Sequence, residues 1–514
     1  MDSILAKVTA LILILVVAIA VFTAAKPICL RFMTEADFER RRNVWVALTV
    51  TAFISPSFWL YVLVAGPLVF WAARKDTNPV ALYVLVFLVI PPNLSLEIPV
   101  FGINALFRLD NLRLLAFAIL IPAAWRLMRT PANIEARRLT LMDVSILAYG
   151  ALVVGLMLPL ESVTHNMRRG FLFLIDYLVL YYVVSRTCTS RPAIVDTMAS
   201  FCLTCAILSP LALVETLRAT LLYPFIMEQW TNAHLAYQTR SGVLRAMVSA
   251  GQALSLGNLL AIGFGFWLYL RSRIQSAPLT MVVVIWLWAG LFATSSRGPA
   301  VAAVALSFAY LALGTNGAGR FITASIISAV AAGLVLVSPI GEQVIDRLPF
   351  VGTIGAENVA YRQQLLATAW EQIKANPLFG NPLVLMELES MRQGEGIIDL
   401  LNTYANIAMF YGCPALFLYV GFLFLGMRNA YRLARVSAVA DPELSLLAAS
   451  LVACLLALLL MMGMGGMGPG MERLLYVVIG LAAGCARLGQ LKEPGQARRL
   501  QRHMPVSRWM PKHS

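Results

Sequence analysis

The chain has 514 residues, of which 60% are hydrophobic and 13% charged, and its mean hydropathy is +0.77. This composition excludes an ordinary water-soluble globular protein. The formal charge of +14 would suit nucleic acid, but most basic residues lie in short segments between apolar runs, so we expect them to set membrane topology and expect no nucleic-acid partner.

Apolar runs long enough to cross a hydrocarbon core of ~30 Å recur along nearly the whole chain, which predicts an all-α, polytopic integral membrane protein. We expect roughly 14 transmembrane helices. Residues 44–73 leave the number open, because Ser55-Pro56 interrupts a run too long for one ordinary span and too short for two. The candidate spans are 4–25, 44–54, 57–73, 79–94, 111–128, 141–159, 168–185, 193–214, 253–270, 278–294, 299–314, 320–338, 403–426, 444–463 and 473–488.

Lysine and arginine in the short connections predict the orientation of these spans. The basic connections near residues 74–75, 126–138, 186–191, 271–273, 320 and 428–435, and the tail beyond 487, all fall on one side, which we expect to be cytoplasmic. The opposite, external side then carries two long loops, 215–250 and 338–402, besides the short loops 96–110, 161–169, 294–299 and 464–473.

The seven cysteines predict neither a disulfide framework nor a metal site, because they lie in or beside apolar runs. Cys202 and Cys205 have the spacing of a redox or zinc motif, yet no second pair or histidine follows them. We expect packing roles for the cysteines, and we expect neither a metal nor another cofactor.

Arginine is overrepresented on the predicted external side, whereas Lys374 is nearly the only lysine there. A guanidinium group can hold phosphate oxygens through two parallel hydrogen bonds, so this bias favours a phosphorylated, membrane-associated ligand such as an isoprenoid pyrophosphate. The external arginines are Arg108, Arg113, Arg168, Arg169, Arg218, Arg240, Arg245, Arg297, Arg347, Arg362, Arg392 and Arg473.

Arg297 is the sharpest candidate, because Thr294 to Pro299 joins two apolar spans with almost no loop and leaves its charge at the membrane boundary. A structural alternative is an arginine that reaches headgroup phosphates or pairs with a carboxylate.

The second long loop contains an amphipathic segment over 359–375, which we expect to lie along the membrane interface. Farther on, Glu395, Asp399, Asn402 and Asn406 share one helical face entering the next span and predict a wet cavity. Alternatively, this segment is only the exposed start of a helix, with Asp near its positive end.

Four short motifs lie in the later part of the chain: Arg245 with Gly251, then Ser295-Ser296-Arg297-Gly298, then Arg362 with Trp370 and Asn376-Pro377-Leu378-Phe379-Gly380, then Leu401-Asn402-Thr403-Tyr404 with Gly412. In these motifs the chain resembles the superfamily of O-antigen ligases and Wzy-type polysaccharide polymerases. The second motif is similar to the family's serine-arginine-glycine turn, the third to part of its large periplasmic loop, the fourth to its histidine-asparagine-to-glycine motif, and the first to another arginine region. Residues 79–489 would form the family core, with a GT-C-like architecture. Residues 1–78 would be an additional N-terminal transmembrane segment, and 490–514 a basic, disordered cytoplasmic tail.

One residue departs from this resemblance, because Leu401 stands where ligases carry a histidine thought to assist the acceptor. Asp399 is the nearest carboxylate that could take its place, with Glu395 and Glu389 as substitutes. The resemblance implies that Arg297, Arg245 and Arg362 bind pyrophosphate and that Asp399 activates the acceptor. Arg169, Asn402, Tyr404 and Glu395 would bind substrate.

The implied function is an inverting, metal-independent glycosyltransferase that polymerises undecaprenyl-pyrophosphate-linked oligosaccharides into exopolysaccharide or O-antigen. It would sit in the bacterial inner membrane with its active site facing the periplasm and its C-terminus in the cytoplasm. A chain-length regulator or an export complex would be its protein partner. Two further enzymes or carriers remain open, an O-antigen ligase and a lipid-linked oligosaccharide flippase, as does a non-catalytic assembly partner.

Overall fold

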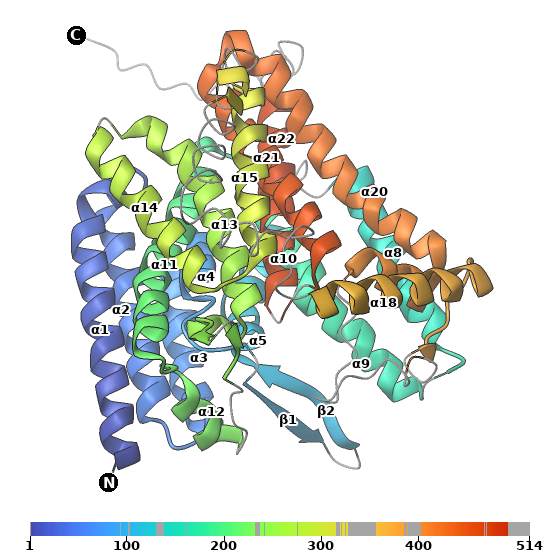
Figure 1. Cartoon of the computed structure of the whole chain (residues 1–514), viewed down its shortest axis with the longest axis horizontal. Helices are drawn as coiled ribbons and strands as arrows, with labels where there is room; N and C mark the ends of the chain where they lie inside the picture. Colours follow the sequence, from blue (N-terminus) through green and yellow to red (C-terminus); the bar gives the residue numbers. More distant parts are fainter. Residues whose placement is uncertain are drawn as a thin grey trace, which may run out of the picture.

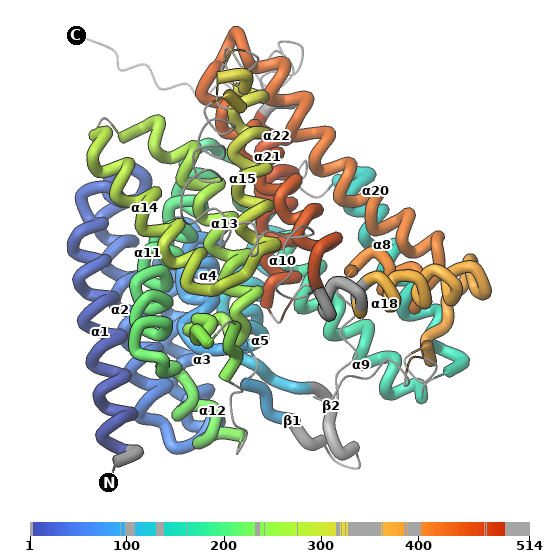
Figure 2. Tube along the Cα trace, in the orientation of Figure 1, coloured from blue at the N-terminus to red at the C-terminus, as the bar shows by residue number. Residues whose placement is uncertain are grey.

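The computed structural model is a bundle of long helices with two short β-hairpins (Figure 1). It describes residues 2–92, 94–100, 103–129, 138–160, 162–231, 237–240, 242–274, 276–314, 319, 321–323, 325–326, 356–384, 388, 402–466, 468 and 470–491. Figure 2 shows the N-terminal helices (blue) on one flank and the helix of residues 403–440 (orange) on the opposite flank, with the last helix (red) between them.

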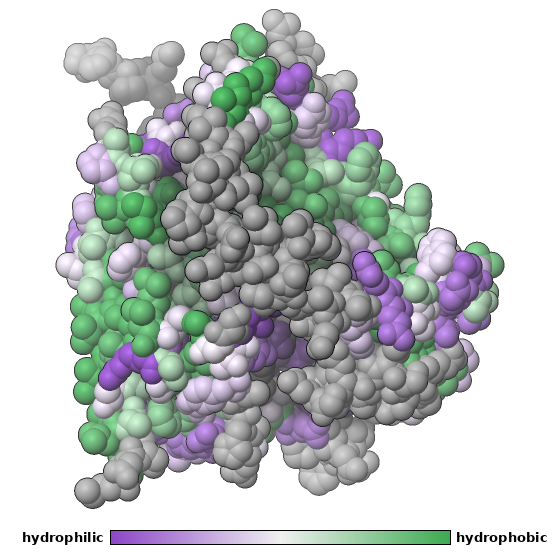
Figure 3. Space-filling model, viewed as in Figure 1, coloured by the Kyte–Doolittle hydropathy of each residue, from purple (hydrophilic) through white to green (hydrophobic). Residues whose placement is uncertain are grey.

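Seven helices in the described part of the chain are long and apolar enough to cross a membrane, which confirms the predicted all-α membrane protein. They are Ile4–Cys29, Asn111–Arg129, Val163–Thr187, Arg191–Arg218, Ala253–Arg273, Thr403–Ala440 and Pro442–Met464. Leu141–Met157, Ala277–Ala293 and Arg297–Leu313 are shorter apolar helices. Hydrophobic side chains cover much of the lateral flank, as lipid contact requires (Figure 3).

The N-terminal third begins with three long helices, and the proline that left residues 44–73 open separates the second from the third. The elements are α1 (Asp2–Cys29), α2 (Glu35–Ile54), α3 (Phe58–Lys75) and α4 (Pro79–Val86). Ser55 and Pro56 lie between α2 and α3, and the Ser57 hydroxyl accepts the backbone N–H of Leu60 to start α3. The Arg41 guanidinium of α2 is buried and donates to Asp76 Oδ1 (2.7 Å) and Asp196 Oδ1 (2.6 Å), which ties these helices to α11 (Arg191–Arg218).

The expected span 79–94 is a helix only as far as Val86. All eight residues of α4 are buried, so this segment packs inside the bundle. A turn follows α4, and Pro91-Pro92 excludes a helix through the end of the expected span. An antiparallel hairpin follows, β1 (Ser95–Val100) with β2 (Ile103–Asp110), in which Ser95 pairs with Asp110. The sequence analysis predicted a plain loop for residues 96–110.

The middle of the chain forms four helical segments, followed by a short helix, a small β-hairpin and a 3-10 turn. The elements are α5 (Asn111–Leu115), η1 (Ala116–Leu120), α6 (Ile121–Arg129), α8 (Leu141–Met157), α9 (Val163–Phe173), η3 (Leu174–Val179), α10 (Leu180–Thr187), α11, α12 (Pro224–Thr231), β3 (Thr239–Arg240), β4 (Val243–Leu244) and η4 (Val248–Ala250). Here η1 and η3 are π-helical turns within longer helices, a feature common at functional sites.

The last part of the chain completes the bundle. Its elements are α13 (Ala253–Leu270), η5 (Arg271–Arg273), α14 (Ala277–Ala293), α15 (Arg297–Leu313), α18 (Ala356–Ala375), α20 (Thr403–Ala440), α21 (Pro442–Met464) and α22 (Met471–Leu491). Helix α21 packs against α13, α15, α20 and α22. Most of the expected span 320–338 lies outside the described residues.

Connections predicted to share a side of the membrane lie together. Arg191 and Arg273 both pair with Glu443 (2.7 and 2.8 Å), which joins three of the predicted cytoplasmic connections. At the other end of the bundle, the indole N–H of Trp230 donates to Ser55 O (3.0 Å) and the N–H of Ala246 donates to Ala293 O (3.1 Å). Figure 1 shows β1, β2 and α12 at this second end, which we call the external end after its predicted orientation.

Candidate functional site

A strained turn carries Arg297 at the external end. Helix α14 stops at Ala293, Ser295 has a left-handed backbone (φ 49°), and Arg297 is the half-buried first residue of α15. The Thr294 hydroxyl donates to Leu291 O (2.7 Å) and accepts the Ser296 N–H (3.3 Å), which fixes the turn. A left-handed serine is uncommon and marks functional sites when the surroundings enforce it. We call residues 294–297 the arginine turn.

The first long external loop folds onto this turn. Arg245 Nε donates to Thr294 O (3.2 Å) and its Nη2 donates to Ser296 Oγ (3.0 Å). Arg240 Nη1 donates to Ser295 O (2.6 Å). The structure therefore brings Arg245 to the turn that carries Arg297, two positions chosen separately from the sequence, and adds Arg240, which the sequence analysis counted only among the external arginines.

The electrostatics of this cluster favour an anion. Burial, together with the neighbouring positive charge of Arg240, lowers the pKa of Arg245 to about 10. Among the described residues, no carboxylate lies within ion-pair distance of Arg245. A half-buried guanidinium that is destabilised by a second cation gains free energy when an anion binds beside it.

Glu215 holds the loop in place and was missed by the sequence analysis. Its carboxylate is 1% exposed and accepts the backbone N–H groups of Leu222 (2.9 Å), Met247 (2.9 Å) and Val248 (2.8 Å). These bonds fix the residues that follow Arg245. A carboxylate at the end of an apolar helix was the available signal, since burial there demands several hydrogen bonds.

The two motif segments around Gly380 and Gly412 are in direct contact. Gly412 (φ 80°) kinks α20, and the Asn381 N–H donates to Met409 O (2.6 Å) while the Cys413 N–H donates to Pro377 O (2.8 Å). A Cβ atom on Gly412 would lie 2.2 Å from Leu378 O, so only glycine permits this contact. The segment 376–381 therefore docks on the kink.

The amphipathic segment predicted at 359–375 is α18, which packs against α20. Leu365 and Ala369 are buried, whereas Leu366 and Trp370 of the same predicted apolar stripe are exposed. Arg362 belongs to this helix, but its side chain lies outside the described residues, as do Glu395 and Asp399 entirely.

The start of α20 places two of the predicted substrate-binding residues. The Asn402 side chain caps the helix by accepting the N–H groups of Tyr404 (3.0 Å) and Ala405 (3.1 Å). The Tyr404 hydroxyl donates to Leu459 O on α21 (3.0 Å), and its ring lies beside Gly463. Asn402 therefore caps the start of α20.

Arg169 lies next to the kink in α20. Its Nη1 donates to the hydroxyl of Tyr411 (3.3 Å), the residue before the kink. The structure thus places Arg169 with the Gly412 motif, while Arg245 lies at the arginine turn.

Several external arginines have structural partners instead of an open binding face. Arg473 is 8% exposed and pairs with Asp176 (2.6 Å), which also pairs with Arg113 (2.8 Å). Arg108 pairs with Glu97 across the hairpin (3.0 Å). Arg108, Arg113 and Arg473 therefore have carboxylate partners within the protein, and the structure adds no support for a phosphate-binding role at these three positions.

Beside this network, Glu472 presents an exposed carboxylate that accepts the hydroxyl of Tyr177. The ring of Tyr177 stacks on that of Tyr476 at 4.8 Å. The loop before Glu472 approaches the arginine-turn side of the bundle, since a Cβ on Gly468 would contact Ser255 Oγ (2.2 Å) in α13.

No family model and no curated protein matches this chain.

Proposed function

We propose that this protein polymerises undecaprenyl-pyrophosphate-linked oligosaccharides by glycosyl transfer on the external face of a bacterial inner membrane. The observation that carries the proposal is the convergence of Arg240 and Arg245 on the turn that begins α15 with Arg297. The contact between the Gly380 and Gly412 segments adds support, because both belong to the resemblance.

The reaction requires little from the protein beyond positive charge near the leaving group and correct placement of the donor and the acceptor. The donor sugar is already activated, because its anomeric carbon carries pyrophosphate. An acceptor hydroxyl attacks that carbon, the bond to the phosphate oxygen breaks, and the electron pair leaves with the lipid pyrophosphate. Arginines stabilise the negative charge that develops on the leaving group, and one direct displacement inverts the anomeric configuration.

A general base would take the proton from the acceptor hydroxyl. Asp399 and Glu395 remain the proposed groups from the sequence. Glu472 is a further candidate for contact with the acceptor sugar, because its carboxylate is exposed beside stacked tyrosine rings. Arg169, Asn402 and Tyr404 would line the acceptor side, and Arg362 the donor side.

The membrane arrangement proposed with this function has roughly 14 spans in a GT-C-like architecture. The seven clear spans, the shorter apolar helices and the gathering of connections at two ends support it. The active site would face the periplasm, the C-terminus would lie in the cytoplasm, and a chain-length regulator or export complex would bind alongside.

Expression of Arg245→Ala in cells, with glycan chain length read on a gel, tests the proposal. If the protein is a polymerase, we expect cells with Arg245→Ala to lose polymer and to accumulate single lipid-linked repeats outside the membrane. Repeats trapped inside would indicate a flippase, and carrier-linked polymer that fails to reach its acceptor lipid would indicate a ligase. Wild-type glycan output would contradict a role for the arginine turn.

A further inference from the structure

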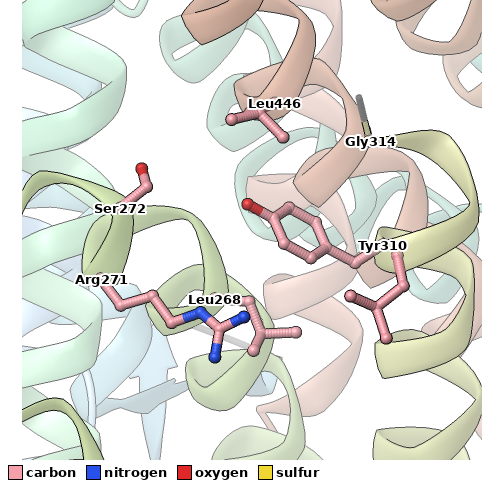
Figure 4. A pocket seen from close by; sticks show the side chains of 7 residues that line it. Leu268, Arg271, Ser272, Tyr310, Gly314 and Leu446 are labelled. Carbon is pink, nitrogen blue, oxygen red and sulfur yellow. The ribbon is translucent and has the colours of Figure 1, made fainter. Parts of the chain in front are cut away.

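A separate cavity lies at the opposite end of the bundle from the arginine turn. It has a volume of about 250 Å³ and is lined by Leu268, Arg271, Ser272, Tyr310, Leu311, Gly314 and Leu446. These residues come from α13 with η5, from α15 and from α21, so the cavity lies between three helices that pack together (Figure 4).

Its walls are amphipathic. Leu268, Leu311 and Leu446 supply apolar surface, while the Arg271 side chain and the Tyr310 ring extend into the same space (Figure 4). The Ser272 hydroxyl donates back to Tyr269 O (2.6 Å). Arg271 is therefore the cation of this cavity, with the Tyr310 hydroxyl as a polar neighbour.

The Arg271 guanidinium makes no hydrogen bond or ion pair with any residue that the structure describes. The nearby acids are used by other cations, since Glu443 pairs with Arg191 (2.7 Å) and Arg273 (2.8 Å) and Asp441 pairs with Arg191. A half-buried guanidinium whose donors have no partner among the described residues can form paired hydrogen bonds with the oxygens of an anion that enters the cavity.

We propose that this cavity binds the phosphate of an anionic phospholipid, with Arg271 holding the phosphate and the leucine side chains contacting the start of an acyl chain. The cavity is smaller than those that enclose a drug-sized ligand, which suits a headgroup with its tails left in the bilayer. Basic pockets between transmembrane helices on the cytoplasmic side are known to hold such headgroups.

The experiment uses the purified full-length protein in detergent and measures bound lipid by native mass spectrometry. Phosphatidylglycerol should bind the wild type saturably, phosphatidylcholine should bind more weakly, and Arg271→Ala should weaken phosphatidylglycerol binding by about tenfold or more. Arg432→Ala removes an exposed arginine from α20 and serves as the matched control, with binding expected to stay at the wild-type level.

Inorganic phosphate is titrated in parallel to separate lipid from a soluble phosphate compound. If inorganic phosphate binds in an Arg271-dependent way and the protein shows no preference for phosphatidylglycerol over phosphatidylcholine, the site takes a soluble phosphate. This result would overturn the lipid assignment. Equal losses for Arg271→Ala and Arg432→Ala would reduce the effect to general surface charge and overturn the site. Arg271→Lys should bind with intermediate affinity, because an ammonium keeps the charge but loses the paired donors.

Discussion

Arg245→Gln should separate stability from function. The lowered pKa of Arg245 means that its charged form carries roughly 2–3 kcal/mol of unfavourable free energy at neutral pH, after allowance for screening at a half-buried group. Glutamine removes this charge and can still donate to Thr294 O or Ser296 Oγ. The loss of one of the two charge-assisted hydrogen bonds costs about 1.5–3 kcal/mol, which is similar to the free energy recovered by removing the charge. The variant should therefore be about as stable as the wild type.

Inorganic pyrophosphate supplies the functional half of this test. It should raise the melting temperature of the wild type, because binding to the folded state alone stabilises by about 1.4 kcal/mol at a ligand concentration ten times Kd. Arg245→Gln should lose most of this increase. Arg432→Gln, on an exposed part of α20, is the control and should keep it.

The pH dependence of the free energy of unfolding tests the same unfavourable charge on Arg245. Because folding lowers the pKa of Arg245, the unfavourable contribution is present below about pH 10 and disappears as the pH rises through this value towards the ordinary pKa of arginine. The wild type should thus gain stability relative to Arg245→Gln above about pH 10. A destabilised Arg245→Gln that still responds fully to pyrophosphate would refute the reasoning.

The remaining predictions concern the groups that shape the external end. Gly412→Ala should abolish docking of the 376–381 segment and lower polymer output, because the added Cβ would lie 2.2 Å from Leu378 O. The control Gly421→Ala should leave output unchanged, because its Cβ would lie 3.7 Å from the nearest neighbouring atom. Equal output from both variants would contradict the docking role. Glu215→Ala should leave three backbone N–H groups unpaired and destabilise the protein by about 3 kcal/mol, so that limited proteolysis cuts the first long loop. Protease resistance like that of the wild type would contradict the role of Glu215 in holding this loop. Glu472→Gln should raise KM for the acceptor or lower kcat while the pyrophosphate-induced shift in melting temperature persists, and unchanged glycan output would remove Glu472 from the site.

Sequence reasoning predicted the membrane class and most helix positions because lipid imposes a strong and local rule. Each span must be apolar and must satisfy its own backbone, so hydropathy alone locates it. Ser55-Pro56 marked the boundary between α2 and α3, and the amphipathic period predicted α18. The rule fails for residues 79–94, because an apolar run buried inside the bundle need not cross the membrane as a helix.

The candidate site was only partly predictable, since contacts between distant segments are not local. Arg245 and Arg297 were selected from separate motifs, but the contact of Arg245 with the arginine turn depends on the loop that Glu215 holds, and the backbone partners of Glu215 appear only in three dimensions. The sequence likewise did not show which carboxylate pairs with which arginine. Arg473, for example, pairs with Asp176, a residue far away in sequence. Asp399, Glu395 and the Arg362 side chain remain predictions from the sequence.

The most direct measurement is a cryo-electron microscopy map of the protein in a lipid nanodisc with undecaprenyl pyrophosphate. The account predicts density for the diphosphate beside Ser295 to Arg297, within hydrogen-bond distance of the Arg240 and Arg245 guanidinium groups. Diphosphate density elsewhere, with both guanidinium groups still bound only to the turn, would contradict it.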